Sequence, residues 1–195
     1  LVRALTGEAL GAGAPASDVL NKGLLAGMAV VGERFRVRDI FLPDVLLAAK
    51  AMDAGLDVLR PRLADQDVPA RAKVVLGSVR GDLHDIGKNL VGIMLKGAGF
   101  EVIDLGHDVP PETFVETAIA SGAAVVGMSA LLTTTMPRMK EVVDLLRDRE
   151  PSRRIKTIVG GAPVTAEFAR AIGADGWAFD AGSAVARIAT HVEAG

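Results

Sequence analysis

The residues best suited to chemistry are an aspartate and a histidine two positions apart. Asp82 and His84 stand in the segment Arg80–Asn89, directly after an apolar run that ends at Val79. A carboxylate on one imidazole nitrogen fixes the tautomer, makes the ring more basic and leaves the other nitrogen free to bind a metal. The same residues are also compatible with a helix cap and a solvated loop histidine. For an isolated Asp-x-His pair, that plainer interpretation is favoured.

The glycines of this loop do not form a phosphate-binding motif. Five residues separate Gly81 from Gly87, and Asn89 follows Lys88 where a Walker A loop needs Ser or Thr. The acidic side chains of Asp82 and its neighbour Asp85 would also repel a phosphate. A dinucleotide-type glycine pattern is absent from this turn.

Histidine is scarce in the chain, which limits metal sites. An ordinary zinc site needs three or four protein ligands, and the other two histidines are His107 and His191. A bare-metal site of His84, His107 and Asp82 is one alternative, whereas we expect His191 to be a surface helix residue. A metal that brings its own equatorial ligands, as in a macrocyclic cofactor, needs only one protein nitrogen.

From residue 72 onward, short apolar runs alternate with stretches of helical periodicity. We expect strands over 73–79, 100–105, 124–128, 155–159 and 176–179, and helices over 87–98, 111–121, 134–149, 164–172 and 182–193. Five strand–helix units predict an α/β fold with a doubly wound parallel sheet. Ligands of such sheets bind beyond the carboxyl ends of the strands, so the functional residues should follow the apolar runs.

The first part of the chain is different and predicts a small helical bundle over residues 1–62. Helices are expected over Leu1–Leu10, from Ser17 onward and from Phe41-Leu42-Pro43, with the proline in a first turn. Polar residues and prolines from Pro61 to Arg71 predict a linker or hinge over 63–71. The α/β domain should then occupy 72–195.

The composition excludes several classes of protein. The chain has 195 residues, 50% of them hydrophobic, a net charge of −2 and no cysteine. Disulfides, thiolate metal sites and cysteine nucleophiles are therefore excluded, and a cytoplasmic location is expected. The near-neutral charge argues against nucleic-acid or membrane-surface binding. No apolar stretch approaches the 18 residues of a membrane span.

Three motifs in order resemble those of cobalamin-binding domains. They are Asp82-x-His84-x-x-Gly87, Ser129-x-Leu131 and Gly160-Gly161, each directly after an expected strand. The helical half, with Gly27-Met28 to Phe35 and then Phe41-Leu42-Pro43, resembles the cap module of methionine synthase and of the corrinoid proteins of methyltransferase systems. The resemblance covers nearly the whole chain, and it implies a flavodoxin-like five-stranded sheet preceded by a helical cap.

The resemblance also implies roles for particular residues. His84 would replace the cofactor's own base as the lower axial ligand of cobalt, Asp82 would bond the distal nitrogen of His84, and Thr135 would be the third member of this ligand triad. Cobalamin-binding roles are implied for Gly81, Asp82, Leu83, His84, Asp85, Gly87, Ser129, Leu131, Thr133, Gly160, Gly161, Ala162 and Ala181, with Phe35 and Leu42 of the cap over the methyl face. Trp177 and Phe179 are candidates to flank the slot of the nucleotide tail, but core positions are favoured for both. His107 is expected near the ring edge without being a ligand.

The function implied by the resemblance is methyl transfer. Cobalamin, or another corrinoid, would be bound base-off and His-on and would shuttle a methyl group through Co(I) and methyl–Co(III). The expected partners are methyl-donor and methyl-acceptor methyltransferase subunits and a reductive activase, so the chain would be a cofactor-carrying subunit rather than a complete enzyme. The alternatives are a cobalamin-dependent light sensor or regulator, the B12 subunit of a mutase and a metal-responsive module.

Overall fold

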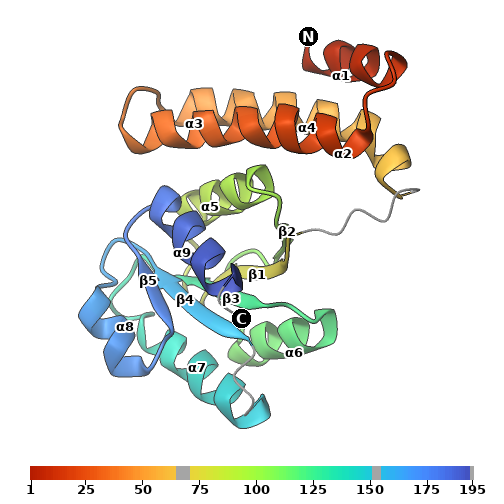
Figure 1. Ribbon diagram of the computed structural model, residues 1–195. Helices are drawn as coiled ribbons and strands as arrows, with labels where there is room; N and C mark the ends of the chain where they lie inside the picture. The colour runs from red at the N-terminus through yellow and green to blue at the C-terminus, as the bar shows by residue number, and fades with distance from the viewer. Residues whose placement is uncertain (65–70, 151–154, 194–195) are drawn as a thin grey trace. The chain divides into compact units, whose positions relative to one another are not determined.

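The chain consists of two units, a helical one that begins at Leu1 and an α/β one that begins at Arg71. Figure 1 shows the computed structural model, which describes residues 1–64, 71–150 and 155–193. No helix within these ranges is both long enough and apolar enough to cross a lipid bilayer.

The helical unit contains the helices expected from the sequence. Helix α1 spans Val2–Gly11, and a second helical segment is built from α2 (Ala16–Asp18), the π-helix η1 (Val19–Leu25) and α3 (Ala26–Arg36). Helix α4 (Leu42–Ala64) has Pro43 in its first turn, where a proline lacks no needed N–H. Val45 and Leu59 of α4 are fully buried.

The end of α4 differs from the expected boundary. The helix includes Pro61 and continues to Ala64, past the limit of 62 predicted for the helical domain. Pro61 lies in the last turn of α4, and the helix continues for three residues beyond it. Of the predicted linker 63–71, Leu63 and Ala64 are helical, whereas residues 65–70 lie outside the described residues.

The α/β unit confirms the predicted flavodoxin-like sheet. Strands β1 (Lys73–Ser78), β2 (Glu101–Asp104), β3 (Val125–Ser129), β4 (Lys156–Gly160) and β5 (Gly176–Ala178) are all parallel and lie in the order β2-β1-β3-β4-β5. Because the central strands are buried on both faces, their sequences are almost continuously apolar. The strand order reverses between β1 and β3, which is where such sheets bind ligands.

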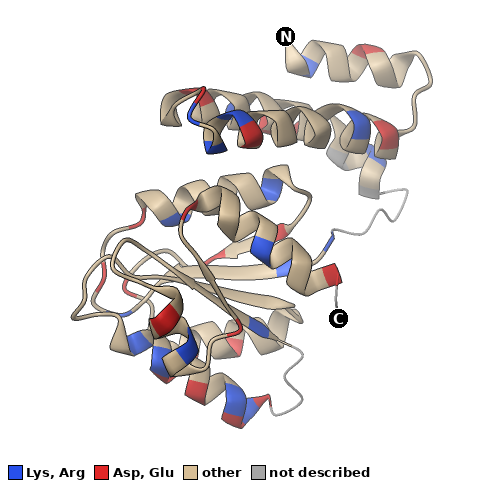
Figure 2. Cartoon of the chain, turned by 60° about the vertical axis from the view of Figure 1, so that its left-hand side comes forward, with Lys and Arg blue, Asp and Glu red and all other residues tan. Residues whose placement is uncertain are grey.

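Within the described residues, five helices cover the two faces of the sheet. Helices α5 (Ile86–Gly97) and α9 (Ala181–Glu193) lie on one face, and α6 (Pro111–Ser121), α7 (Pro137–Arg149) and α8 (Ala166–Ile172) lie on the other (Figure 1). The core under α6–α8 contains fully buried Phe114 and Met139. Helix α7 carries both basic and acidic residues (Figure 2), including the pair Arg138–Glu141.

Candidate functional site

His84 lies in the loop that joins β1 to α5, at the carboxyl edge of the sheet. Its side chain is half exposed, and its Nδ1 atom lies 2.8 Å from Oδ1 of Asp82. The backbone N–H of His84 donates to the same oxygen over 3.1 Å. The carboxylate therefore fixes both the ring and the main chain of the histidine.

Asp82 is completely buried and accepts five hydrogen bonds. Besides the two bonds from His84, its Oδ2 atom accepts from Thr135 Oγ1 at 2.7 Å, from the Leu131 amide at 2.7 Å and from the Leu132 amide at 3.2 Å. The structure thus brings Asp82, His84 and Thr135 together, although Thr135 is 53 positions away from the aspartate in the chain.

These contacts determine the charge of Asp82. Burial by itself would raise the pKa of this carboxyl. Hydrogen bonds from Thr135, from His84 and from the Leu131 amide outweigh burial and hold the pKa well below its ordinary value of 3.8. The aspartate is therefore a carboxylate at neutral pH.

The ionised carboxylate also determines the tautomer of the imidazole. A carboxylate can only accept hydrogen bonds, so Nδ1 of His84 carries the hydrogen. In the neutral ring, the lone pair then resides on Nε2, which is the atom available to bind a metal. Such a carboxylate–histidine arrangement is the usual support of a metal-binding imidazole.

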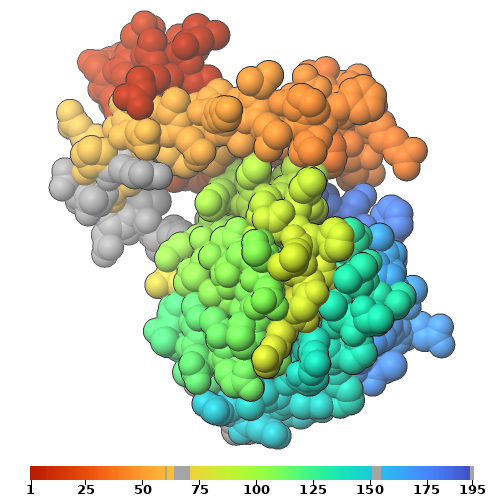
Figure 3. Space-filling model, turned by 180° about the vertical axis from the view of Figure 1, so that it is seen from behind, coloured from red at the N-terminus to blue at the C-terminus, as the bar shows by residue number. Residues whose placement is uncertain are grey.

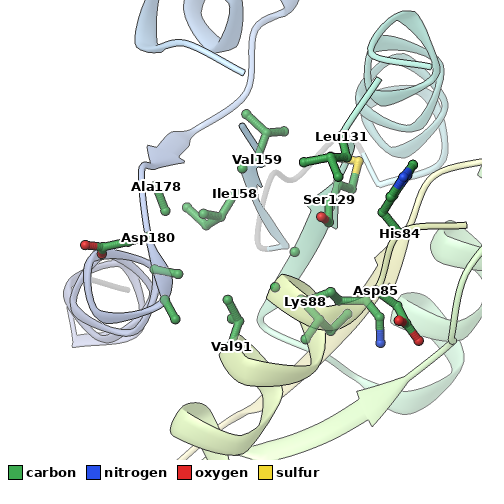
Figure 4. A pocket seen from close by; sticks show the side chains of 18 of the residues that line it. His84, Asp85, Lys88, Val91, Ser129, Leu131, Ile158, Val159, Ala178 and Asp180 are labelled. Carbon is green, nitrogen blue, oxygen red and sulfur yellow. The ribbon is translucent and has the colours of Figure 1, made fainter. Parts of the chain in front are cut away.

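A cavity of about 590 Å³ opens beside His84, between the sheet and helices α5 and α9. Figure 4 shows His84 on one side of the cavity and Ala178 with Asp180 on the other. Most of the wall is apolar, from Leu76 on β1 to Ile188 on α9. Ten of the residues implied by the sequence resemblance line it: Leu83, His84, Asp85, Gly87, Ser129, Leu131, Gly160, Gly161, Ala162 and Ala181.

The other implied residues lie outside this wall. Gly81 and Asp82 are in the turn before His84 and do not line the cavity. Thr135 does not line it either, because its hydroxyl is directed to the Asp82 carboxylate. Thr133 is exposed in the turn after β3 and is likewise absent from the cavity wall. Phe35 and Leu42 belong to helices α3 and α4 of the helical unit.

Phe179 lines the cavity, contrary to the expectation that it is a core residue. It follows the last residue of β5, and 75% of its surface is exposed. Its ring contacts Trp177 edge-on at a centroid distance of 6.3 Å. Trp177 itself is partly buried against the core, with its indole N–H donating to the Val164 carbonyl.

Lys88 is a second cavity residue that sequence reasoning missed. Its side chain is 1% exposed, and its ammonium lies 2.5 Å from an oxygen of Asp104 and 2.6 Å from Asn89 Oδ1. The carbon chain of the lysine can therefore line an apolar wall while its charge is paired. The sequence spacing could have indicated this position, because Lys88 and Val91 share one face of α5 and Val91 also lines the cavity.

The backbone explains the two glycines at the end of β4. Gly161 has φ +128°, and a Cβ there would lie 1.9 Å from the Ala130 carbonyl oxygen. Only glycine allows the loop after β4 to approach the end of β3 so closely. Gly161 is thus required by the turn, whereas a Cβ on Gly160, the last residue of β4, would lie 3.0 Å from the Ala178 carbonyl oxygen. Both glycines line the cavity.

The arrangement suits a metal that arrives with most of its own ligands. In the described ranges, no three His, Cys, Asp or Glu side chains are grouped to hold a metal ion, and His107 is exposed outside the cavity wall. The site instead offers one imidazole nitrogen beside a long apolar cavity. Exposed apolar side chains at the cavity, Leu83, Ile86 and Phe179, could contact a large, flat cofactor.

Comparison with known proteins gives consistent matches. A family model described as a B12 binding domain matches residues 72–188, and a second with the same description matches residues 1–60. A corrinoid protein of Desulfitobacterium hafniense is 45% identical, over 86% of this chain and 79% of that protein. Dimethylamine corrinoid protein 1 of Methanosarcina acetivorans is 44% identical, over 88% of this chain and 81% of its own.

A solved structure matches the fold over almost the whole chain. It belongs to the methanol:cobalamin methyltransferase complex of Methanosarcina barkeri, with 30% sequence identity and a TM-score of 0.86. The match covers 97% of this chain and 72% of that one.

Proposed function

The chain belongs to the corrinoid proteins with B12-binding domains, and we propose that it is the methyl-carrying subunit of a methyltransferase system. Cobalamin or another corrinoid is its cofactor. The methyl-carrier role is supported by the relatives, which include a dimethylamine corrinoid protein and a structure from a methanol:cobalamin methyltransferase complex.

The observation that carries the proposal is the position of His84 beside a large apolar cavity, with Nδ1 held by buried Asp82 so that Nε2 carries the lone pair. We infer that Nε2 is the lower axial ligand of cobalt and that the cavity takes the cofactor's displaced nucleotide tail. When bound, the corrinoid supplies a cobalt centre that accepts a methyl group as Co(I) and releases it from methyl–Co(III).

Asp82 and its hydrogen-bond donors determine the tautomer and the basicity of the His84 imidazole. Asp82 keeps its negative charge behind the ring, so Nδ1 stays protonated and the electron density at Nε2 increases. Thr135 and the two backbone amides keep Asp82 in place.

Two further roles follow from the resemblance. Phe35 and Leu42 would form an apolar cover over the reactive face of the cofactor and exclude water. The partners would be the methyltransferases that supply and accept the methyl group, together with a reductive activase. These partners, and not this chain, would determine the methyl donor.

The ligand is tested by visible absorption spectra of the apoprotein mixed with hydroxocobalamin and with methylcobalamin. We expect a base-off, His-on spectrum for the native chain and its loss in His84→Ala. The matched control is His107→Ala, because His107 is exposed and lies outside the cavity wall. Identical spectra for native protein and His84→Ala would refute the axial-ligand assignment.

A further inference from the structure

The loop after β2 contains a residue in an unusual backbone conformation. Asp108 has φ +54°, in the left-handed region that side chains other than glycine seldom adopt. Asp and Asn tolerate this region best, but the conformation still costs free energy. Such residues persist where neighbouring contacts hold them in place, so the contacts of Asp108 indicate what the conformation achieves.

Those contacts are with the turn that precedes His84. The Gly81 N–H donates to Asp108 Oδ1 over 2.6 Å, and the Asp108 N–H donates to the Asp82 carbonyl over 3.1 Å. Gly81 is itself left-handed, with φ +82°. Asp108 therefore holds the main chain on both sides of the peptide bond between Gly81 and Asp82.

The other end of the turn is held by Ser78. This serine is fully buried, and its hydroxyl donates to the His84 carbonyl over 2.7 Å. Its own backbone is bonded to the loop after β2, through Gly106 and Val109. In the space-filling view of Figure 3, the yellow residues after β1 lie between the green segment after β2 and the teal segment after β3.

We propose that Asp108 is a positioning residue which, with Ser78, fixes the turn 81–84 so that His84 presents Nε2 to the corrinoid. The hydrogen bonds of the Asp82 carboxylate orient the imidazole only if the Asp82 main chain is itself fixed. Asp108 supplies that restraint, through one side-chain and one backbone bond. The inference rests on the proposed function of His84, and it assigns to the loop after β2 a part in cobalt ligation.

The test is the dissociation constant of hydroxocobalamin, measured by absorption titration of the full chain. Asp108→Gly keeps the left-handed backbone but removes the acceptor, and we expect the constant to rise about two- to tenfold, the effect of one lost hydrogen bond. Asp108→Asn retains an acceptor and should restore the constant to within about twofold. In a His84→Ala background, Asp108→Gly should have no further effect, because the residue acts through His84.

The matched control is Asp175→Ala. Asp175 is also a loop aspartate that accepts a backbone N–H, from Thr157 over 2.9 Å, but it lies at the opposite edge of the sheet. Its loss should leave the dissociation constant unchanged. If Asp108→Gly binds like the native chain, or weakens binding equally without His84, the positioning role is wrong. If His84→Ala itself leaves binding and spectrum unchanged, the proposed ligand fails as well.

Discussion

Replacing Thr135 by valine tests how strongly the buried carboxylate depends on its donors. Valine keeps the shape of threonine but lacks the hydroxyl that donates to Asp82 Oδ2 over 2.7 Å. Thr135 is 7% exposed and Asp82 is fully buried, so water cannot readily replace this donor. A hydrogen bond to a charged group contributes about 1.5–3 kcal/mol. We therefore expect the free energy of unfolding to fall by about 1.5–3 kcal/mol at pH 7.

The effect of Thr135→Val should also depend on pH. The pKa of Asp82 in the folded chain is below its ordinary value of 3.8, so the unfolded chain takes up this proton first as the pH falls. The stabilisation that Asp82 provides is therefore complete above the ordinary pKa and is lost as the pH falls below it. Because the Thr135 hydroxyl favours the charged form, its loss should raise the folded-state pKa of Asp82. The deficit of the valine variant should therefore shrink only as the pH falls through that folded-state pKa, below the ordinary value.

The assay is urea denaturation at several pH values. Thr135→Ser keeps the hydroxyl and should lose only the buried methyl, about 0.8 kcal/mol. Thr134→Val makes the same change at the exposed neighbouring position and should stay within about 0.5 kcal/mol of the native chain. The reasoning is refuted if Thr135→Val is as stable as Thr134→Val, or if the serine variant loses as much as the valine variant.

Two further variants probe the cavity wall. In Gly161→Ala, the new Cβ would lie 1.9 Å from the Ala130 carbonyl oxygen at φ +128°, so thermal denaturation should show a loss of about 3 kcal/mol or a failure to fold. Gly87→Ala meets nothing within 4 Å and should fold normally; equal stability of the two variants would contradict the close approach. Ala184→Leu fills the cavity from α9 and should weaken hydroxocobalamin binding about tenfold or more. Ala186→Leu, exposed on the same helix, should not change it, and equal affinities would show that the cavity is not the binding site.

The α/β unit was predictable because its sequence pattern has one dominant physical cause. The interior of a parallel strand that is buried on both faces must be almost entirely apolar, and residues 74–77 of β1 show this directly. The expected helix 111–121 was correct at both ends, since Pro111 begins it and Gly122 follows in the left-handed conformation. Elements with clear start and stop residues are therefore the ones that the sequence alone places best.

The errors occurred where burial depends on neighbours distant in the chain. Phe179 has the residue type of a core aromatic, yet it comes after the last residue of β5 and faces the cavity. Lys88 is of a residue type that is usually found on the surface, yet its side chain is buried. The burial is possible because its ammonium forms an ion pair with Asp104 at the end of β2. In both cases, position relative to a strand end would have been a better guide than residue type.

The Asp82–His84 pair also shows that residue types alone do not reveal contacts between distant parts of the chain. Asp82 and His84 are close in the sequence, but two of the donors to the carboxylate are the backbone amides of Leu131 and Leu132. Backbone donors cannot be identified from the type of the residue that carries them. They reach Asp82 only because β1 and β3 are neighbours in the sheet and the loops after both strands begin at the same edge. Without those donors, a buried carboxylate would be protonated or excluded from the interior. The same two residues would then be an ordinary helix-capping aspartate and a solvated histidine, so it is the order of the strands that gives the motif its chemistry.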